Sequence, residues 1–131
     1  MSSAKILLIE PNQDVALCLR IALNHAGYGV VHLENARDGL SAALQCPPDL
    51  IITELNAGEI DGLRLIELIR SANGLQRTPV IVHATISNRL SVARCLDAGA
   101  NQVIQKPVGV VPVVEAVNGL LGRNSRHAAA D

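Results

Sequence analysis

Five short apolar runs alternate with five amphipathic stretches along this 131-residue chain, and this alternation limits its fold more than any other feature. The runs are almost purely aliphatic, as is typical of strands in a parallel sheet that is buried on both faces. The stretches between them repeat apolar residues at close to the 3.6-residue period of a helix. Strands are therefore expected at Lys5–Ile9, Val30–Leu33, Leu50–Thr53, Pro79–His83 and Val103–Ile104. Helices are expected at Asp14–Ala26, Ala36–Cys46, Leu63–Ala72 and Pro112–Leu121. A further helix is expected to run from a cap at Ser87 or Asn88 to about Ala98.

Strand–helix alternation repeated five times predicts an α/β fold, with one parallel sheet and helices on both of its faces. Right-handed crossovers favour the strand order 2-1-3-4-5 for such a five-stranded sheet. We expect one domain over residues 4–122, followed at 123–131 by a flexible tail or the start of a linker, because this last segment has no periodicity.

The predicted topology brings three charged side chains together. In the order 2-1-3-4-5, the ligand crevice of the sheet lies beyond the carboxyl ends of strands 1 and 3. Those ends are Glu10-Pro11 and Glu54, and Lys106 arrives at the same edge from strand 5. The sequence therefore predicts a pocket that contains two carboxylates and one ammonium group.

Composition excludes several classes of function. The net charge is −1 and Tyr28 is the single aromatic residue, so neither a basic nucleic-acid surface nor a base-stacking platform is expected. No apolar run approaches the roughly 20 residues of a membrane span. The three cysteines, Cys18, Cys46 and Cys95, are widely spaced and form no CxxC pair. This pattern is typical of reduced thiols in a cytoplasmic protein and indicates no metal centre.

Seven short segments in register resemble the response-regulator receiver domain of the CheY type, over about Lys5 to Leu121. The resemblance implies a two-component or phosphorelay-type signalling module. It also implies a cis peptide bond between Lys106 and Pro107. The matching segments are Lys5-Ile-Leu-Leu-Ile-Glu-Pro-Asn-Gln-Asp14, Ala26-Gly-Tyr-Gly-Val-Val31, Pro48-Asp-Leu-Ile-Ile-Thr-Glu54, Ile60-Asp-Gly62, Thr78-Pro-Val-Ile-Val82, Ala98-Gly-Ala100 and Lys106-Pro107.

The resemblance also assigns roles in the pocket, and only one of them is kept. Receivers hold Mg²⁺ with an acidic pair after strand 1 and an Asp after strand 3, and this Asp accepts a phosphoryl group. Here Glu10 and Pro11 stand at the acidic pair and Glu54 at the phosphoacceptor position, whereas Lys106 matches. Pro11 supplies no carboxylate, and the extra methylene of Glu54 shifts its carboxylate by roughly 1.5 Å. A misplacement of about 1 Å can cost on the order of 100-fold in rate.

The two switch positions of a receiver are also changed. Ala84 stands where the family has a Ser or Thr, and Val103 stands where it has an aromatic side chain. Thr85, the next hydroxyl, is expected to point to the opposite face of the strand. We therefore interpret the chain as a pseudo-receiver that is not an enzyme, is not phosphorylated by the usual Asp and Mg²⁺ route, and needs no cofactor.

Several alternatives stay open. The chain could be a working receiver that is phosphorylated on an unusual residue, or a pseudo-receiver that senses a small ligand. A weak divalent-metal site would use Glu10, Glu54 and a carbonyl near Asn56. The Glu54–Lys106 pair is either a permanent imitation of the charged state or a plain salt bridge.

Two further sites have structural interpretations. Asp61-Gly62 is expected to cap the third helix. His83 is expected to be accommodated beside a helix, with a proton-sensitive role as the alternative.

Apolar side chains are predicted on the surface formed by the fourth helix, fifth strand and fifth helix. Such a patch indicates contacts with a protein partner, either a component of a histidine-kinase pathway, an output domain or a second copy of the chain. The alternative is that these side chains bury one another. The residues are Leu90, Val92, Val103, Val108, Val110 and Val111.

Overall fold

The sheet has the predicted strand order, β2-β1-β3-β4-β5, and all its neighbouring strands are parallel. The structure is a computed structural model that describes residues 3–86 and 88–122. The strands are β1 (Lys5–Ile9), β2 (Gly29–Leu33), β3 (Leu50–Thr53), β4 (Val80–Ala84) and β5 (Gln102–Gln105). The helices are α1 (Gln13–His25), α2 (Ala36–Gln45), α3 (Gly62–Ser71), α4 (Arg89–Ala98) and α5 (Val110–Leu120).

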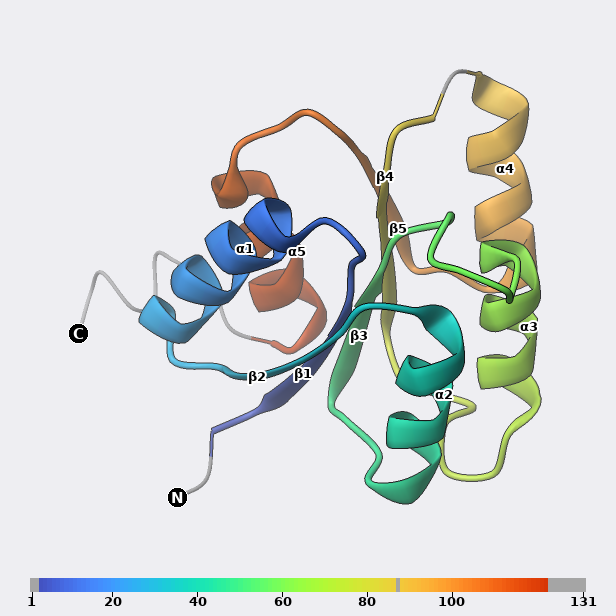
Figure 1. Cartoon of the computed structure of the whole chain (residues 1–131), viewed down its shortest axis with the longest axis horizontal. Coiled ribbons are helices and arrows are strands. Elements are labelled where there is room, and N and C mark those ends of the chain that lie inside the picture. Colours follow the sequence, from blue (N-terminus) through green and yellow to red (C-terminus); the bar gives the residue numbers. More distant parts are fainter. Residues whose placement is uncertain (1–2, 87, 123–131) are drawn as a thin grey trace.

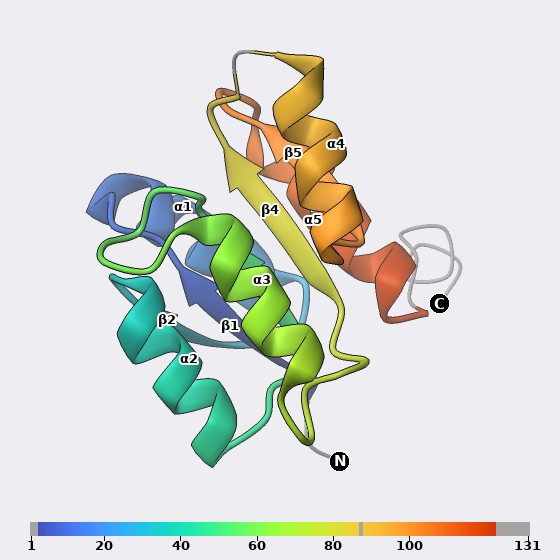
Figure 2. The same cartoon turned by 90° about the vertical axis from the view of Figure 1, so that its right-hand side faces the viewer.

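The helices form two layers. Helices α1 and α5 lie together on one side of the sheet, and α2, α3 and α4 cover the other side (Figure 1). The turned view shows α2, α3 and α4 side by side in front of the strands (Figure 2). Each strand alternates its side chains between these layers, so Ile6 and Leu8 of β1 join the α1–α5 core while Leu7 and Ile9 join the other.

Local signals account for most helix boundaries. The side chains of Asn12, Asp61 and Asn88 each accept a hydrogen bond from a backbone N–H in the first turn of α1, α3 and α4. The predicted cap of Asp61 is thus confirmed. For α4 the predicted cap was Ser87 or Asn88, and Asn88 is the one described, since Ser87 lies outside the described residues.

One predicted boundary is wrong by two residues. Helix α5 begins at Val110 rather than at Pro112. Pro112 still lies in the first turn, where backbone N–H groups have no partner within the helix and a proline costs little. The other predicted bounds differ from the observed ones by one residue or less.

Three smaller findings complete the fold. Cys18 and Cys46 are exposed and Cys95 is buried, and all three are free thiols. None of the helices within residues 3–86 and 88–122 combines the length and the apolar character needed to cross a bilayer. The predicted tail at 123–131 lies outside the described residues.

Candidate functional site

The carboxyl edge of the sheet brings Glu10, Glu54 and Lys106 into direct contact, as the topology predicted. Glu10 follows β1, Glu54 follows β3 and Lys106 follows β5. The Lys106 Nζ lies 2.7 Å from Glu10 Oε1 and 2.9 Å from Glu54 Oε1. The exposed fractions of these side chains are 16% for Lys106, 2% for Glu10 and 12% for Glu54, so the charges meet largely out of water.

Backbone pairing places the three side chains. The N–H of Glu10 donates to Leu33 O and the N–H of Glu54 donates to Ile9 O, which extends the sheet by one residue on each strand. Lys106 donates from its backbone N–H to Ala84 O, and its bond to Pro107 is cis, as the resemblance implied.

Backbone N–H groups engage the remaining carboxylate oxygens. Glu10 Oε2 accepts from the N–H of Asn12 at 3.1 Å. Glu54 Oε2 accepts from the N–H of Leu55 at 2.6 Å and is 3.4 Å from the N–H of Asn56. All four carboxylate oxygens of the pair therefore already accept a hydrogen bond.

The ion pairs determine the charge state of the lysine. Burial alone would lower the pKa of Lys106, but its hydrogen bonds to Glu10 and Glu54 and their negative charges outweigh this effect and raise the pKa above its ordinary value. The ammonium form is therefore strongly favoured, and the cluster carries two negative charges against one positive charge.

These residues do not fit the Mg²⁺ that the fold family implies. Mg²⁺ requires near-octahedral oxygen ligation, mostly from carboxylates and water. Each carboxylate here holds Lys106 with one oxygen and a backbone N–H with the other, and Pro11 adds no oxygen-bearing side chain. A cation would have to compete with these contacts and with the adjacent positive charge of Lys106. Within the described residues, no group of three His, Cys, Asp or Glu side chains has the arrangement of a metal site.

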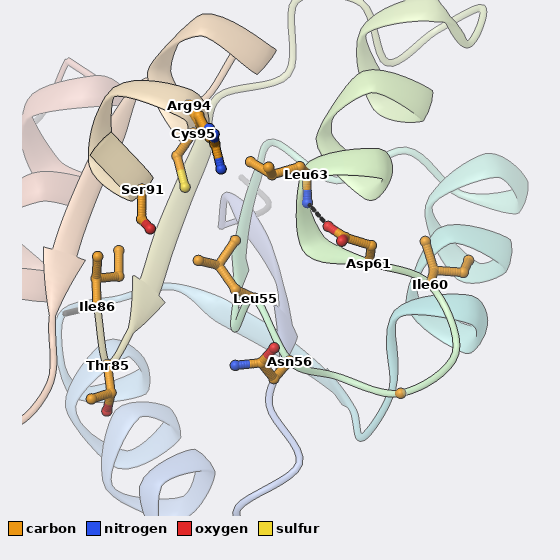
Figure 3. A pocket seen from close by; sticks show the side chains of 11 residues that line it. Leu55, Asn56, Ile60, Asp61, Leu63, Thr85, Ile86, Ser91, Arg94 and Cys95 are labelled. Atoms are coloured by element: carbon orange, nitrogen blue, oxygen red, sulfur yellow. Dashed lines mark hydrogen bonds between the residues drawn. The ribbon is translucent and has the colours of Figure 1, made fainter. Parts of the chain in front are cut away.

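Both switch positions contain apolar side chains in packed surroundings. Ala84 is fully buried in the core beneath α2, α3 and α4. Val103 is half-buried and packs against the same core. Thr85 is exposed and lines a cavity of about 420 Å³ between α4 and the loop that precedes α3. Figure 3 shows Thr85 and Asn56 on the wall of this cavity, and none of the three charged residues lines it.

The loop before α3 depends on a glycine next to the cap. Gly62 donates from its N–H to Leu55 O at 3.1 Å. A Cβ at this position would lie 2.7 Å from Leu55 O, so a larger residue would push the loop away. Asp61 caps the helix through Leu63, drawn as the dashed line in Figure 3. The motif therefore holds in place the loop that carries Glu54 and Leu55, which the sequence interpretation of a cap alone did not include.

The sequence analysis did not predict one hydrogen-bond contact of the site. The His32 ring Nε2 lies 2.8 Å from the backbone oxygen of Glu10. The pairing of Leu8 with His32 in the sheet explains this, but the strand register was not predicted. His83 was expected beside a helix; it is buried, and neither of its ring nitrogens has a hydrogen-bond partner among the described residues.

The predicted apolar surface divides into two halves. Exposed side chains are Leu90, Val108 and Val111. Val92 and Val103 pack against the core under α4, and Val110 packs against the core under α1 and α5. Mutual burial is thus confirmed for Val92, Val103 and Val110, and a partner contact stays a prediction for the exposed three.

Comparisons with known proteins agree with the fold. The family model described as response regulator receiver domain matches residues 6–118. The response regulator ArlR of Staphylococcus aureus is 32% identical over 127 residues, which are 97% of this chain and 57% of that protein. The chain thus spans little more than half the length of this relative.

Two solved structures give the same architecture. The receiver domain of a signal transduction histidine kinase from Syntrophus aciditrophicus is 31% identical, with a TM-score of 0.84, over 92% of this chain and 91% of that one. The receiver domain of a sensor histidine kinase from Pseudomonas aeruginosa has a TM-score of 0.84 at 22% identity, over 92% and 99% of the two chains. In that second structure a magnesium ion is coordinated in the active site cleft.

Proposed function

Because this chain belongs to the family of response regulator receiver domains, we propose that it is a pseudo-receiver: a signalling module of that family that acts through protein contacts and is not phosphorylated by the usual Mg²⁺-dependent route. One observation carries the proposal. Lys106 bridges Glu10 and Glu54, and every carboxylate oxygen of the two is already hydrogen-bonded. The ammonium group that would otherwise stabilise an incoming phosphoryl group is therefore already paired within the pocket.

The arrangement favours a single state over a switch. A receiver needs an acceptor carboxylate, a metal site and side chains that respond to the new phosphoryl group. Ala84 and Val103 offer neither a hydroxyl nor an aromatic ring; Ala84 lies in the core and Val103 packs against it. Glu54 holds its charge next to Lys106 without any phosphoryl group. We therefore assign the Glu54–Lys106 pair the role of keeping this edge in one conformation.

Phosphorylation is tested by incubating the chain with Mg²⁺ and acetyl phosphate and measuring its intact mass. We expect no addition of about 80 Da, because Pro11 supplies no carboxylate for the metal and Lys106 already pairs with both carboxylates of the pocket. The matched control is the double variant Pro11→Asp and Glu54→Asp, which adds the missing carboxylate at position 11 and shortens the acceptor side chain at position 54 while Lys106 stays in place. An adduct on the unchanged chain would overturn the proposal and support a working receiver with an unusual acceptor.

The same proposal extends to partners, which would be a kinase-pathway component, an output domain or a second copy of the chain in the cytoplasm. The exposed Leu90, Val108 and Val111 support a protein contact, because aliphatic side chains gain from leaving water. Sedimentation at two concentrations tests self-association. The double variant Leu90→Asp and Val111→Asp should abolish any dimer, and a monomer at both concentrations would exclude the second copy as the partner.

A further inference from the structure

The cavity between α4 and the loop before α3 has both polar and aliphatic walls. Its volume is about 420 Å³, which lies within the usual range for sites that bind small molecules. Figure 3 shows Ser91 and Arg94 of α4 on one side of this space and Asp61 and Leu63 on the other. The full wall consists of Leu55, Asn56, Gly58, Ile60, Asp61, Leu63, Thr85, Ile86, Ser91, Arg94 and Cys95.

Two opposite charges of this wall are available to a ligand. Arg94 lies on α4 and Asp61 caps α3, and both residues are exposed, so a molecule in the cavity can reach them. Neither of them forms an ion pair with a residue that the structure describes. The N–H of Leu63 engages Oδ1 of Asp61 and leaves Oδ2 to face other groups.

The charge of Asp61 acts across the cavity as far as α4. Burial raises the pKa of the Cys95 thiol, and the negative charge of Asp61 raises it further. Cys95 follows Arg94 directly in α4 and lines the same cavity. A small molecule between the two walls is therefore within the field of both charges.

Uncharged polar side chains add further hydrogen-bonding groups. Asn56, Thr85 and Ser91 line the cavity with an amide and two hydroxyl groups. Among the side chains drawn in Figure 3, the one hydrogen bond is the capping contact between Asp61 and Leu63. These three side chains therefore do not satisfy one another, and they are open to a polar ligand.

The balance of charges favours a ligand that carries both signs. The neighbouring pocket has the two carboxylates of Glu10 and Glu54 against the ammonium group of Lys106. Asp61 and Arg94 add one charge of each sign, so the region stays net negative. A phosphate or another multiply charged anion would be repelled by Asp61, and a simple cation by Arg94. A zwitterion has an opposite charge for each of them.

We propose that this cavity binds a free amino acid with an aliphatic side chain. Arg94 pairs with its carboxylate, which a planar guanidinium group suits, and Asp61 pairs with its ammonium group. The aliphatic part of the ligand packs against the aliphatic part of the wall, which consists of Leu55, Ile60, Leu63 and Ile86.

This site is separate from the charged pocket of the family. None of Glu10, Glu54 and Lys106 lines the cavity. The inference therefore goes beyond the proposed function and does not depend on whether Glu54 can be phosphorylated.

The test titrates L-leucine into the ¹⁵N-labelled chain and follows the backbone amides by NMR at pH 7.5 and constant ionic strength. Two further probes each lack one charge: 4-methylpentanoate has no amino group, and 3-methylbutylamine has no carboxylate. We expect saturable shifts at Asn56, Ser91 and Arg94 with leucine. Each of the other probes should bind about fivefold more weakly, as expected for the loss of one solvent-accessible ion pair.

Two single variants assign the ion pairs. Arg94→Gln should bind leucine and 3-methylbutylamine with equal affinity, because the carboxylate has lost its partner. Asp61→Asn should bind leucine and 4-methylpentanoate with equal affinity, and asparagine keeps the cap of α3, so this variant is expected to fold. The matched control is Arg89→Gln, which removes an exposed arginine of α4 that does not line the cavity and should leave all three affinities unchanged.

Several results would overturn the proposal. These are shifts that do not saturate or that cluster elsewhere, equal affinities of the three probes for the unchanged chain, and a preference for leucine that survives both Arg94→Gln and Asp61→Asn. An equal loss of affinity in Arg89→Gln and Arg94→Gln would also overturn it, since it would show attraction to the general charge of α4. Urea unfolding of each variant verifies that the comparison is made between folded chains.

Discussion

Two buried polar regions lie next to each other at the carboxyl edge of the sheet, and they meet their hydrogen-bonding needs in opposite ways. In the charged cluster, Lys106 pairs with Glu10 and Glu54, and backbone N–H groups engage the remaining carboxylate oxygens. His83 is equally buried and has no partner among the described residues. Charge can be buried here because opposite charges pair and hydrogen bonds engage the remaining oxygens, whereas the imidazole of His83 is buried without such a partner among the described residues.

The comparison also separates structure from function. A satisfied cluster stabilises one arrangement and resists new ligands, because binding must first break existing contacts. A buried group without a hydrogen-bond partner costs stability instead.

The largest effect should come from breaking the charged cluster. Replacement of Lys106 by Met leaves two buried carboxylates facing each other, and the free energy of unfolding should fall by about 3 kcal/mol. Urea unfolding at pH 7.5, followed by circular dichroism, measures this. The matched control is Lys5→Met, which removes the other lysine at an exposed site and should change stability by less than about 0.5 kcal/mol.

The stability lost in Lys106→Met should depend on pH in one direction only. Since the fold raises the pKa of Lys106, its contribution is fully present below the pKa of a free lysine and is lost only as the pH rises through the folded value. The difference in the free energy of unfolding between the unchanged chain and Lys106→Met should therefore be constant near pH 8 and become smaller in strongly alkaline solution. A loss of less than about 1 kcal/mol at pH 7.5 would mean that water screens the cluster.

An intermediate effect is expected from His83 in acid. Because the fold lowers the pKa of His83, the unfolded chain takes up a proton near pH 6.5 while the folded chain resists it. Stability should fall as the pH drops below about 6.5, with a slope of up to about 1.4 kcal/mol per pH unit from this group. Urea midpoints between pH 8 and pH 5 for the unchanged chain and His83→Leu test this; parallel curves would contradict it.

The smallest effect sharpens the comparison at neutral pH. Replacement of His83 by Leu removes an unpaired buried imidazole and keeps the volume similar, so the free energy of unfolding at pH 8 should rise by about 1 kcal/mol. Thermal unfolding measures the gain. The exposed His25 supplies the control, since His25→Leu should stay within about 0.5 kcal/mol. A clear loss of stability in His83→Leu would show that the imidazole already has a partner.

The sequence was most informative where the physics is local. Continuous aliphatic runs predicted all five strands, because only a sheet covered on both faces buries such runs. Asp61 identified the start of α3, because a cap needs only the first turn of its own helix. The start of α5 was placed too late, since a proline tolerated in a first turn does not show how many residues precede it.

The sequence predicted which residues meet in the site, but not which contacts they make there. Parallel strands end at one edge, so the meeting of Glu10, Glu54 and Lys106 followed from strand order alone. The division of the apolar surface did not follow, because the exposure of Leu90 and the burial of Val92 depend on how α4 sits against the sheet.

By itself, then, the amino-acid order determined the family architecture, the loss of the acidic pair at Pro11 and the retention of Lys106. Only the tertiary structure decided which oxygen each donor uses, and that both ring nitrogens of His83 are buried without a hydrogen-bond partner among the described residues. The reason is one of range. Periodicity and capping act over a few residues, whereas the contact from Lys106 to Glu54 spans 52 positions and depends on how separate loops are packed.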